Sequence, residues 1–329
     1  MRRVAMGDPQ APFETVLAVL RLHRLLDGDR LRDDVQLVSM GDHFDFGPPE
    51  HRAAATRDGL RLVEWLASHP PEQVVMLLGN HDLARVGELG PFVTDAEFEL
   101  AHAHATQVYR QGGDEVAFRQ RYPNVADAEA LARDFSCFSV AQRELVQRLM
   151  QSRRFQLAHA HEGLLLVHAG VTRDDFARLG VAPKTAEEAA RALNAADLKL
   201  LHRPGSAATQ WGSGVFFHRP AFPKDTPDFA GPFRRRYDPR WLPAEFSQAI
   251  GHIRDKKCHE LLKPWALDAE PLDGPIRSLR VDGDTVQYAR GTFDDARLYL
   301  LDGGMLHASP QAYELFDLDT RSALRAPAA

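Results

Sequence analysis

Three short polar segments of the chain contain side chains that commonly bind divalent cations. They are Gly7-Asp8-Pro9-Gln10, Gly41-Asp42-His43-Phe44-Asp45 and Gly79-Asn80-His81-Asp82. Two histidines that follow later hydrophobic runs, His168 and His252, extend the set. Carboxylate and amide oxygens with imidazole nitrogens, and no thiolate, suit Mn²⁺, Fe, Zn²⁺ or Mg²⁺ and argue against copper(I) and iron–sulfur centres. The candidate metal ligands are therefore Asp8, Asp42, Asn80, His168 and His252.

A pair of such cations has a defined chemical use. Two divalent ions about 3.5–4 Å apart share a carboxylate and a hydroxide, generate a nucleophile near neutral pH and hold both ends of an in-line phosphoryl displacement. Asp42 is the natural bridging carboxylate. The candidate ligands thus predict a metal-centred hydrolase.

Each candidate ligand follows a hydrophobic run, and each run predicts a strand that positions it. The runs are Arg3–Ala5, Val35–Met40, Val74–Leu78, Gly163–Val167 and the start of Phe246–His252. Amphipathic segments at Pro12–Leu26 and His51–Ser68 predict helices that join the first three strands as a βαβαβ unit. Such units form mostly parallel sheets, and ligands gather at the carboxyl ends of their strands.

The remaining sequence predicts one domain over residues 1–329 with a helical insertion at about 85–158 over the site. In the insertion we expect no strand and three helices, at Asp95–Tyr109, Ala126–Phe135 and Val140–Gln151. We expect a helix at Pro183–Leu201 and then an irregular segment, Arg203–Pro243, on the substrate side. Later strands are expected at Ile276–Val281, Thr285–Ala289 and Arg297–Leu301, and a disordered tail at Arg325–Ala329.

Composition limits the classes of function. The formal net charge of −6 argues against broad binding to nucleic acid or to a membrane surface, and no basic segment interleaved with aromatic residues suggests a nucleic-acid track. No apolar run reaches the roughly 18 residues of a transmembrane helix, and the first strand leaves no room for a signal peptide. We therefore expect a cytoplasmic protein. Cys137 and Cys258 are expected to be reduced packing residues.

The motifs resemble those of the calcineurin-like metallophosphoesterases. The similar blocks, in the family's order, are Gly41-Asp42-His43-Phe44-Asp45-Phe46-Gly47-Pro48, Gly79-Asn80-His81-Asp82, His168-Ala169-Gly170 and Gly251-His252. The Gly-Pro pair, the His-Ala-Gly form and Leu301-Asp302-Gly303-Gly304 are most similar to the branch that contains Ser/Thr protein phosphatases and symmetrical dinucleoside tetraphosphate hydrolases. The resemblance spans Val4 to Met305. It implies a four-layer α/β (α+β) fold, a central double β-sandwich flanked by helices.

The resemblance also implies a two-metal site. Asp8 and Gln10 would hold the first ion, and Asp42 would bridge the two ions. The second ion would be completed by Asn80, His168 and His252. We expect manganese, with Fe, Zn²⁺ and Mg²⁺ as the other candidates.

The implied reaction is direct attack by a hydroxide that bridges the two ions. His81 would protonate the leaving oxygen as the general acid, and Asp45 would orient His81. This pairing is chemically sound because imidazole is easily poised near pH 7 and a carboxylate fixes its tautomer.

Three positions depart from the family pattern. Gln10 stands where the family usually has histidine, and Arg254 stands where many phosphodiesterase members have another histidine, so we expect the first ion to be held more weakly. Phe46 occupies the position of a phosphate-binding arginine. Because charge on the phosphoryl oxygens must still be stabilised, we expect Arg254 to replace it, with Arg219 and Arg234–Arg236 as weaker candidates.

The sequence thus predicts a phosphatase that acts on a phosphorylated small molecule, nucleotide or phosphoprotein, with a nuclease disfavoured. Two alternatives stay open. One is a hydrolase of dinucleoside polyphosphates or pyrophosphates, and the other is a degenerate metal-binding regulatory module without catalysis. Retention of His81 and Asp45 favours an enzyme, because a binding module does not need that pair.

Overall fold

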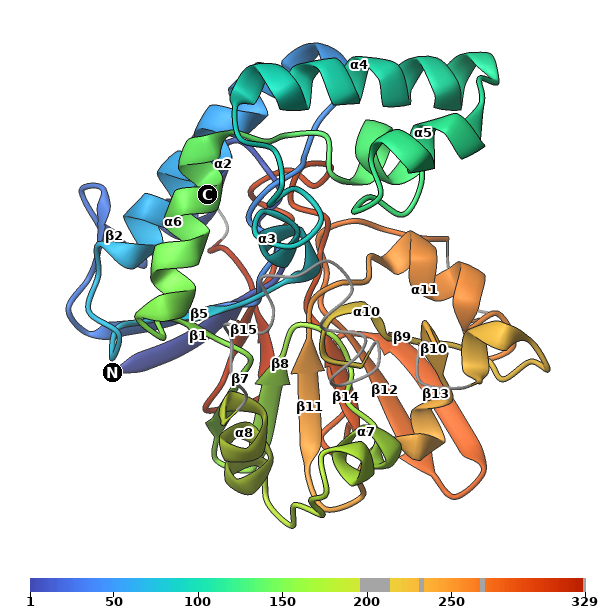
Figure 1. Cartoon of the computed structure of the whole chain (residues 1–329). Coiled ribbons are helices and arrows are strands. Elements are labelled where there is room, and N and C mark those ends of the chain that lie inside the picture. Colours follow the sequence, from blue (N-terminus) through green and yellow to red (C-terminus); the bar gives the residue numbers. More distant parts are fainter. Residues whose placement is uncertain (196–213, 231–233, 267–269, 328–329) are drawn as a thin grey trace.

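Two six-stranded sheets form the centre of the computed structural model, which describes residues 1–195, 214–230, 234–266 and 270–327 (Figure 1). The first sheet runs β16-β15-β1-β4-β5-β6. Its strands are β1 (Arg2–Met6), β4 (Val35–Ser39), β5 (Val74–Leu77), β6 (Phe155–Gln156), β15 (Leu315–Asp317) and β16 (Ser322–Leu324). The second sheet runs β13-β12-β14-β11-β8-β7. Its strands are β7 (Ala158–His161), β8 (Leu164–Val167), β11 (Ser247–Ile250), β12 (Arg277–Asp282), β13 (Thr285–Arg290) and β14 (Leu298–Leu300).

Parallel pairing aligns the strands that carry the predicted ligands. β1, β4, β5 and β6 pair in parallel in the first sheet, and β8, β11 and β14 do so in the second. The outer strands β15, β16, β12, β13 and β7 pair antiparallel to their neighbours. The ligands that follow these parallel strands are therefore delivered to the same edge of each sheet.

Alternating side chains explain why the two sheets pack face to face. Ala5 and Val38 of the first sheet join Leu166 and Tyr299 of the second in one apolar cluster. Their chain neighbours, such as Leu37, belong to a separate cluster that includes the helices. Because successive side chains of a strand point to opposite faces, both faces of each sheet are covered. The predicted double β-sandwich is confirmed.

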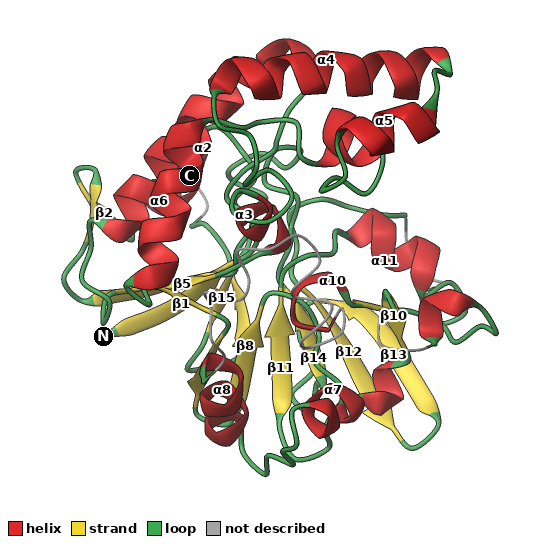
Figure 2. Cartoon of the chain, viewed as in Figure 1, coloured by secondary structure: helices red, strands yellow, loops and turns green. Residues whose placement is uncertain are grey.

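Helices flank the two sheets (Figure 2). Those nearest the first sheet are α1 (Phe13–Leu22), α2 (Arg52–Ala67), which follows the 3₁₀ turn Pro49–His51, and α6 (Val140–Gln151). α2 contacts α1, α6 and β5, and α6 contacts β6. The others are α7 (Arg173–Arg178), α8 (Ala186–Asn194), α10 (Gly214–Phe217) and α11 (Asp255–Leu261), of which α8 packs on β7 and β8.

A helical insertion follows α3 (Asn80–Ala84), and Figure 1 shows it beyond the ends toward which β8 and β11 point. It contains α4 (Asp95–Gln111), α5 (Glu115–Arg121) and a π-helical turn, η2 (Ala130–Asp134). These elements enclose an apolar cluster of their own that includes Phe98, Phe118 and Leu131. The insertion therefore has its own small core, separate from the sandwich.

Several strands were not predicted from the sequence. β6 lies within 85–158, where we expected no strand, and β7 begins at the end of that range. β15, β16 and the β2 (Leu26–Asp27) to β3 (Arg30–Leu31) hairpin were also missed. β6 has only two residues, and β7 reads Ala-His-Ala-His, so neither contains the run of β-branched residues that signals a strand. Their pairing depends on neighbouring strands from elsewhere in the chain.

Other expectations fall partly outside the described residues. The helix expected at Pro183–Leu201 starts at Ala186 and is described to Asn194. Within Arg203–Pro243, residues 203–213 and 231–233 are not described. The rest of that segment contains α10, β9 (Arg219–Pro220), which pairs in parallel with β10 (Arg236–Tyr237), and the 3₁₀ turns Pro227–Phe229 and Pro239–Trp241. In the expected tail, Arg325 donates to Glu314 at 2.7 Å.

Two composition-based expectations can also be compared with the structure. Cys137 and Cys258 are buried and form no disulfide. Among the described residues, no helix combines the length and the apolar character that crossing a membrane requires.

Candidate metal centre and acid–base pair

Four of the predicted ligands meet where strand ends of the two sheets face each other. Asp42 follows β4, Asn80 begins α3 after β5, and His168 and His252 follow β8 and β11. Ligand atoms of Asp42, His168 and His252 lie within 4.8 Å of one another, and Nε2 of His168 lies 3.1 Å from Oδ1 of Asn80. We call this group the second metal position.

The two imidazoles of the second metal position have pKa values that are shifted in opposite directions. His168 Nδ1 donates to the carbonyl oxygen of Met40 at 2.8 Å, which leaves Nε2 facing Asn80 and Asp42 Oδ1, the latter at 3.4 Å. Burial is the largest influence on the pKa of His168 and lowers it, but the charge and hydrogen bond of Asp42 together with the hydrogen bond to Met40 raise it above its ordinary value. His252 Nε2 is buried without a partner in the described part of the chain. Burial and then the charges of Arg219 and His168 lower the pKa of His252, which keeps this imidazole neutral and able to ligate.

Asp8, at the end of β1, has one carboxylate oxygen that no described protein group satisfies. Its Oδ2 accepts from the backbone N–H of His252 at 2.9 Å, whereas Oδ1 is buried with no hydrogen-bond donor among the described residues. Burial, followed by the negative charges of Asp302 and Asp42, raises the pKa of Asp8 well above its usual range. A Cβ atom on Gly251 would lie 1.9 Å from this Oδ1, so the neighbouring block must carry glycine there.

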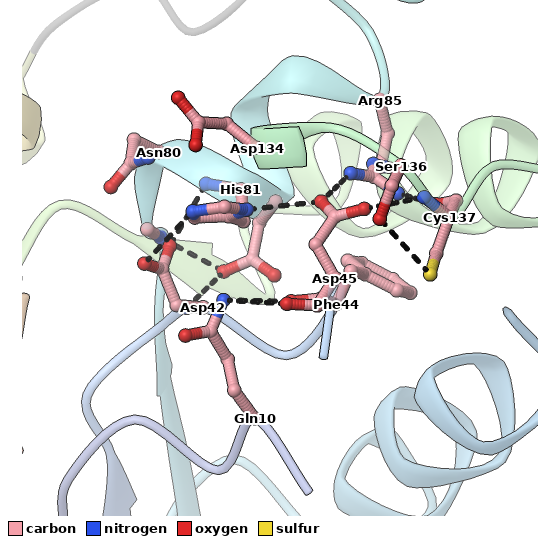
Figure 3. Close-up of polar contacts among 12 residues, drawn as sticks. Gln10, Asp42, Phe44, Asp45, Asn80, His81, Arg85, Asp134, Ser136 and Cys137 are labelled. Carbon is pink, nitrogen blue, oxygen red and sulfur yellow. Dashed lines mark hydrogen bonds and ion pairs between the residues drawn. The ribbon is translucent and has the colours of Figure 1, made fainter. Parts of the chain in front are cut away.

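Gln10 lies beside Asp8 with its amide nitrogen already engaged. Nε2 donates to the carbonyl oxygens of Phe44 at 2.8 Å and Asp45 at 3.3 Å (Figure 3). The amide oxygen Oε1 is therefore the atom left for a cation. Asp8, Gln10 and the bridging carboxylate of Asp42 define what we call the first metal position.

The donor set fits divalent cations. Buried acceptors without donors are costly, and here Asp8 Oδ1, His252 Nε2 and the facing pair His168 Nε2 and Asn80 Oδ1 point into the same region. Oxygen and imidazole donors are the ligands that Mn²⁺, Fe and Zn²⁺ accept. One cation at each of the two metal positions would satisfy these atoms, which no single protein donor could do.

His81 and Asp45 form an oriented acid–base pair beside the centre (Figure 3). Nδ1 of His81 lies 3.0 Å from Oδ2 of Asp45, and Nε2 of His81 lies 3.9 Å from Oδ2 of Asp42. Burial lowers the pKa of His81, but the charge of Asp42 and the hydrogen bond and charge of Asp45 together raise it to about 9. The imidazolium therefore presents Nε2–H toward the metal centre.

The helical insertion completes the surroundings of this pair, a contribution that the sequence did not reveal. The backbone N–H of Cys137 donates to Asp45 Oδ1 at 2.7 Å, and the ring of Phe135 contacts the ring of His81 edge to face at 5.4 Å. Arg85, fully buried, donates to Asp45 Oδ2 and to the carbonyl oxygen of Cys137. Arg85 stands four residues after His81 and could have been noticed for its helical spacing, whereas Cys137 carries no sequence signal for this role.

Asp82 is a second group whose role the sequence did not reveal. Its Oδ2 accepts from the backbone N–H groups of Gly79 at 2.9 Å and Asp42 at 3.0 Å, and its Oδ1 accepts from the backbone N–H of His43 at 3.0 Å. Asp42 has a positive φ of 57°, a conformation that costs energy in a residue with a side chain. The buried Asp82 carboxylate thus holds the loop that aims Asp42.

The two predicted phosphate-binding arginines differ in their partners. Arg254 forms a bidentate ion pair with Asp273, with Nη2 2.9 and 2.8 Å from the two carboxylate oxygens. The side chain of Arg219 has no hydrogen bond or ion pair in the described part of the chain, and the charged groups around it include Asp42, Asp134, Asp302 and Asp8. Burial lowers the pKa of Arg219 despite these carboxylates. Among the described residues, Arg219 is therefore the one of these two arginines whose side-chain donors have no partner, and which of them binds phosphate stays a prediction.

A profile of the calcineurin-like phosphoesterase family matches residues 1–221 of the chain. The chain belongs to the calcineurin-like phosphoesterases. The matched region includes the blocks that contain Asp8, Asp42, Asn80 and His168, and it confirms the resemblance drawn from the motifs. The family is one of phosphoesterases, enzymes that hydrolyse phosphoester bonds.

A curated relative of this phosphoesterase is a symmetrical bis(5'-nucleosyl)-tetraphosphatase of Methylobacillus flagellatus, 27% identical over 218 residues. The matched region is 65% of this chain and 60% of the relative, so the chain spans about three fifths of the relative's length. The relative belongs to the branch that the motifs predicted.

Solved structures similar to this phosphoesterase are more distant. The cold-active protein-tyrosine phosphatase of a psychrophilic Shewanella species has a TM-score of 0.46 at 13% identity, covering 98% of this chain and 80% of that one. A metallophosphoesterase from Sphaerobacter thermophilus has a TM-score of 0.35 at 14% identity, covering 99% and 88% of the two chains.

Proposed function

We propose that this chain is a metal-dependent phosphatase in which His81 is the general acid. The observation that carries the proposal is the placement of His81 between two carboxylates, with Asp45 at Nδ1 and Asp42 near Nε2. A module that only bound metal would gain nothing from an imidazolium aimed at its ligands. Family membership and the cluster of Asp42, His168 and His252 support the same function.

The proposed cofactors are two divalent cations, with Mn²⁺ as the first choice. Asp8, Gln10 and Asp42 would hold one, and Asp42, Asn80, His168 and His252 the other. When bound, such cations supply positive charge for the phosphoryl oxygens and lower the pKa of water that attacks phosphorus.

The chain's own residues move a proton to the leaving group. As the bond between phosphorus and the leaving oxygen breaks, that oxygen takes the proton from His81 Nε2, and water provides the oxygen that remains on phosphorus. Asp45 accepts the Nδ1–H of His81 and stabilises the imidazolium before transfer. Arg85 and the Cys137 N–H hold the Asp45 carboxylate in place by hydrogen bonds to its two oxygens.

Arg219 is the proposed phosphate-binding residue in place of the arginine that is absent at Phe46. Its guanidinium is partly buried, unpaired in the described part of the chain and near Asp42. A buried guanidinium without a partner is costly, and an anionic phosphoryl group would satisfy it with charge-assisted hydrogen bonds.

A cavity beside the first metal position suggests where the leaving group binds. It has a volume of about 470 Å³ and includes Asp8, Gln10, Phe46, Arg254 and His307 in its lining. Phe46, with Pro48, Met305 and Leu306, gives it an apolar side, and its polar lining contains Gln10, Arg254, His307 and the aspartates Asp8, Asp45 and Asp302. The apolar side suits an aromatic or nucleoside leaving group. Together with the relative's printed activity, it favours hydrolysis of dinucleoside polyphosphates as the second candidate function.

The test compares hydrolysis of phenyl phosphate, a phosphotyrosine peptide and a dinucleoside tetraphosphate with added Mn²⁺. Wild type should hydrolyse at least one of them, and His81→Ala should lower kcat by about 10²–10⁴-fold, the usual contribution of a positioned acid. His159→Ala, at a partly buried histidine of β7, is the matched control and should be unaffected. Equal background rates for wild type and His81→Ala on all three substrates would show that the chain is the regulatory module instead.

A further inference from the structure

The first metal position lacks the imidazoles that its family pattern supplies. Gln10 and Arg254 occupy the histidine positions, and Arg254 is committed to Asp273. Without another donor, the first cation would have only Asp8, the neutral oxygen of Gln10 and a share of Asp42. Building on the proposed function, we propose that Asp302 is a further ligand of the first cation, which makes this position an all-oxygen site for Mn²⁺ or Mg²⁺.

The backbone places Asp302 against the first block of the chain. Asp302 follows β14, which pairs in parallel with β11, and the Leu301 N–H donates to the carbonyl oxygen of Ile250 at 2.7 Å. On the other side, a Cβ atom on Gly7 would lie 2.0 Å from the carbonyl oxygen of Leu301 and 3.0 Å from Cα of Asp302. Asp302 thus follows a segment that contacts both Gly7, which precedes Asp8, and Ile250, which lies two residues before His252.

The Asp302 carboxylate is buried but not fully used. Asp302 is 6% exposed, and its Oδ1 accepts a hydrogen bond from the Gly304 N–H at 3.0 Å. Oδ2 has no hydrogen-bond donor among the described residues. Asp302, Asp8 and Gln10 line the same cavity. The buried Oδ1 of Asp8, also without a donor in the described part of the chain, independently marks this region as one that needs a positive charge.

Among the described residues, no protein cation forms an ion pair with either carboxylate, although the charges of Arg277 and Arg254 lower the pKa of Asp302, Arg277 more strongly. Arg277 donates to the backbone oxygens of Ile253 and Asp302, at 2.8 and 2.9 Å, not to the Asp302 carboxylate. Of the charged groups around Asp8, Asp302 has the strongest effect on its pKa and raises it more than Asp42 does. Carboxylates that crowd one another in a buried place bind a hard cation well, and oxygen-only ligation favours Mn²⁺ or Mg²⁺ over Zn²⁺.

The experiment measures metal uptake by the full-length chain after removal of metal. Mn²⁺ binding is followed by isothermal titration calorimetry, and the pair of ions by the spin-coupled Mn²⁺ signal in electron paramagnetic resonance. Asp302→Asn keeps the acceptor for Gly304 but removes the charge. Asp238→Asn, at a buried aspartate that pairs with Arg240, is the matched control.

We expect wild type and Asp238→Asn to bind two Mn²⁺ and to give the coupled signal. Asp302→Asn should weaken binding of the ion that fills its site second by at least about tenfold, because loss of a residue that only hydrogen-bonds to a metal ligand already lowers metal affinity on that scale. The spin-coupled signal should be lost at subsaturating Mn²⁺. Unchanged binding of both ions by Asp302→Asn would overturn the assignment, and so would a wild type that binds one Mn²⁺ only.

A second variant guards against a simple folding defect. Gln10→His in the Asp302→Asn background adds an imidazole to the same position, so it should restore the second ion and shift its preference toward Zn²⁺. If restoration fails while circular dichroism shows native fold, the assignment is wrong. Metal uptake also separates the two proposals. Wild type that binds two Mn²⁺ in an Asp302-dependent manner without hydrolysing any ester would refute the function and support the ligand.

Discussion

Replacing Asp45 by asparagine should remove most of the charge on His81 at neutral pH. Asp45 accepts the Nδ1–H of His81 at 3.0 Å and is not one of the proposed metal ligands. An asparagine at this position can still accept a hydrogen bond through its amide oxygen, so Asp45→Asn removes charge with little change in shape. The variant therefore isolates the electrostatic part of the pair.

The size of the effect follows from the order of the influences on His81. Burial lowers its pKa and is the largest of them; Asp42 raises it, Asp45 raises it through a hydrogen bond and through charge, and Arg85 lowers it. Because burial outweighs Asp42 alone, the pKa without Asp45 should fall below the ordinary 6.5 from about 9. That decrease corresponds to about 3 kcal/mol or more of lost imidazolium stabilisation.

The assay is NMR titration of imidazole signals in the metal-free protein between about pH 5 and pH 10, a range that brackets both expected values. The His81 signal is assigned by its loss in His81→Ala. Asp134→Asn is the control, because Asp134 lies beside the pair in Figure 3 but pairs with Arg133 at 2.9 Å and makes no hydrogen bond to His81. At pH 7.5 wild-type His81 should be almost fully protonated, and His81 in Asp45→Asn protonated to about one tenth or less.

The kinetic counterpart is measured with Mn²⁺ present. Cations beside Asp42 lower the pKa of His81 in both proteins, but the difference due to Asp45 remains. The alkaline limb of kcat for phenyl phosphate should therefore move to lower pH in Asp45→Asn, whereas p-nitrophenyl phosphate, whose leaving group is stable as an anion, should respond less. A metal-free His81 pKa near 9 in Asp45→Asn would refute this reasoning and assign the shift to Asp42 alone.

Three further results are expected. Arg219→Met should lower kcat/KM for a phosphomonoester by about 10–100-fold, since hydrogen bonds to charged groups contribute about 1.5–3 kcal/mol; equal losses in Arg235→Met, at an exposed arginine of the same segment, would contradict a specific role. Gly251→Ala should displace the Asp8 carboxylate, because its Cβ would lie 1.9 Å from Oδ1, and elemental analysis should find fewer than two metal ions per chain; full occupancy would show that the loop relaxes. Because the pKa of His81 is raised, its contribution to the stability of the metal-free protein is fully present below pH 6.5 and is lost as pH rises through about 9. Urea unfolding should therefore show that the free energy of unfolding decreases over this range by up to about 3 kcal/mol, and the decrease should be absent in His81→Gln.

Much of the fold could be predicted because its signals are local. Hydrophobic runs that end before Asp42 and Asn80 mark strands whose carboxyl ends must share an edge once a helix joins them in parallel. Strands without such a run were missed. β6 and β15 are three residues long or shorter, and their pairing comes from partners that lie far away in the sequence.

The candidate site likewise has a part that local sequence signals predict and a part that depends on tertiary contacts. The order of the blocks predicts which residue types gather, because each ligand sits directly after its own strand. The partners of those ligands come from distant segments: Cys137 is 92 residues from Asp45, and Asp8 and the backbone of His252 are 244 residues apart. Loop closure over such distances leaves no periodic trace in the sequence.

The sequence by itself determined that Asp8, Asp42, Asn80, His81, His168 and His252 could form a metal centre with an acid, since residue type and position after a strand are enough for that prediction. Only the tertiary structure decided which cations are free. Arg254 is near His252 in sequence, but its guanidinium forms an ion pair with Asp273. The guanidinium of Arg219 lies near the metal centre and has no partner in the described part of the chain. It also brought Asp302 beside Asp8. Which side chains pair depends on tertiary contacts between segments that are far apart in the sequence, and the local sequence pattern does not encode those contacts.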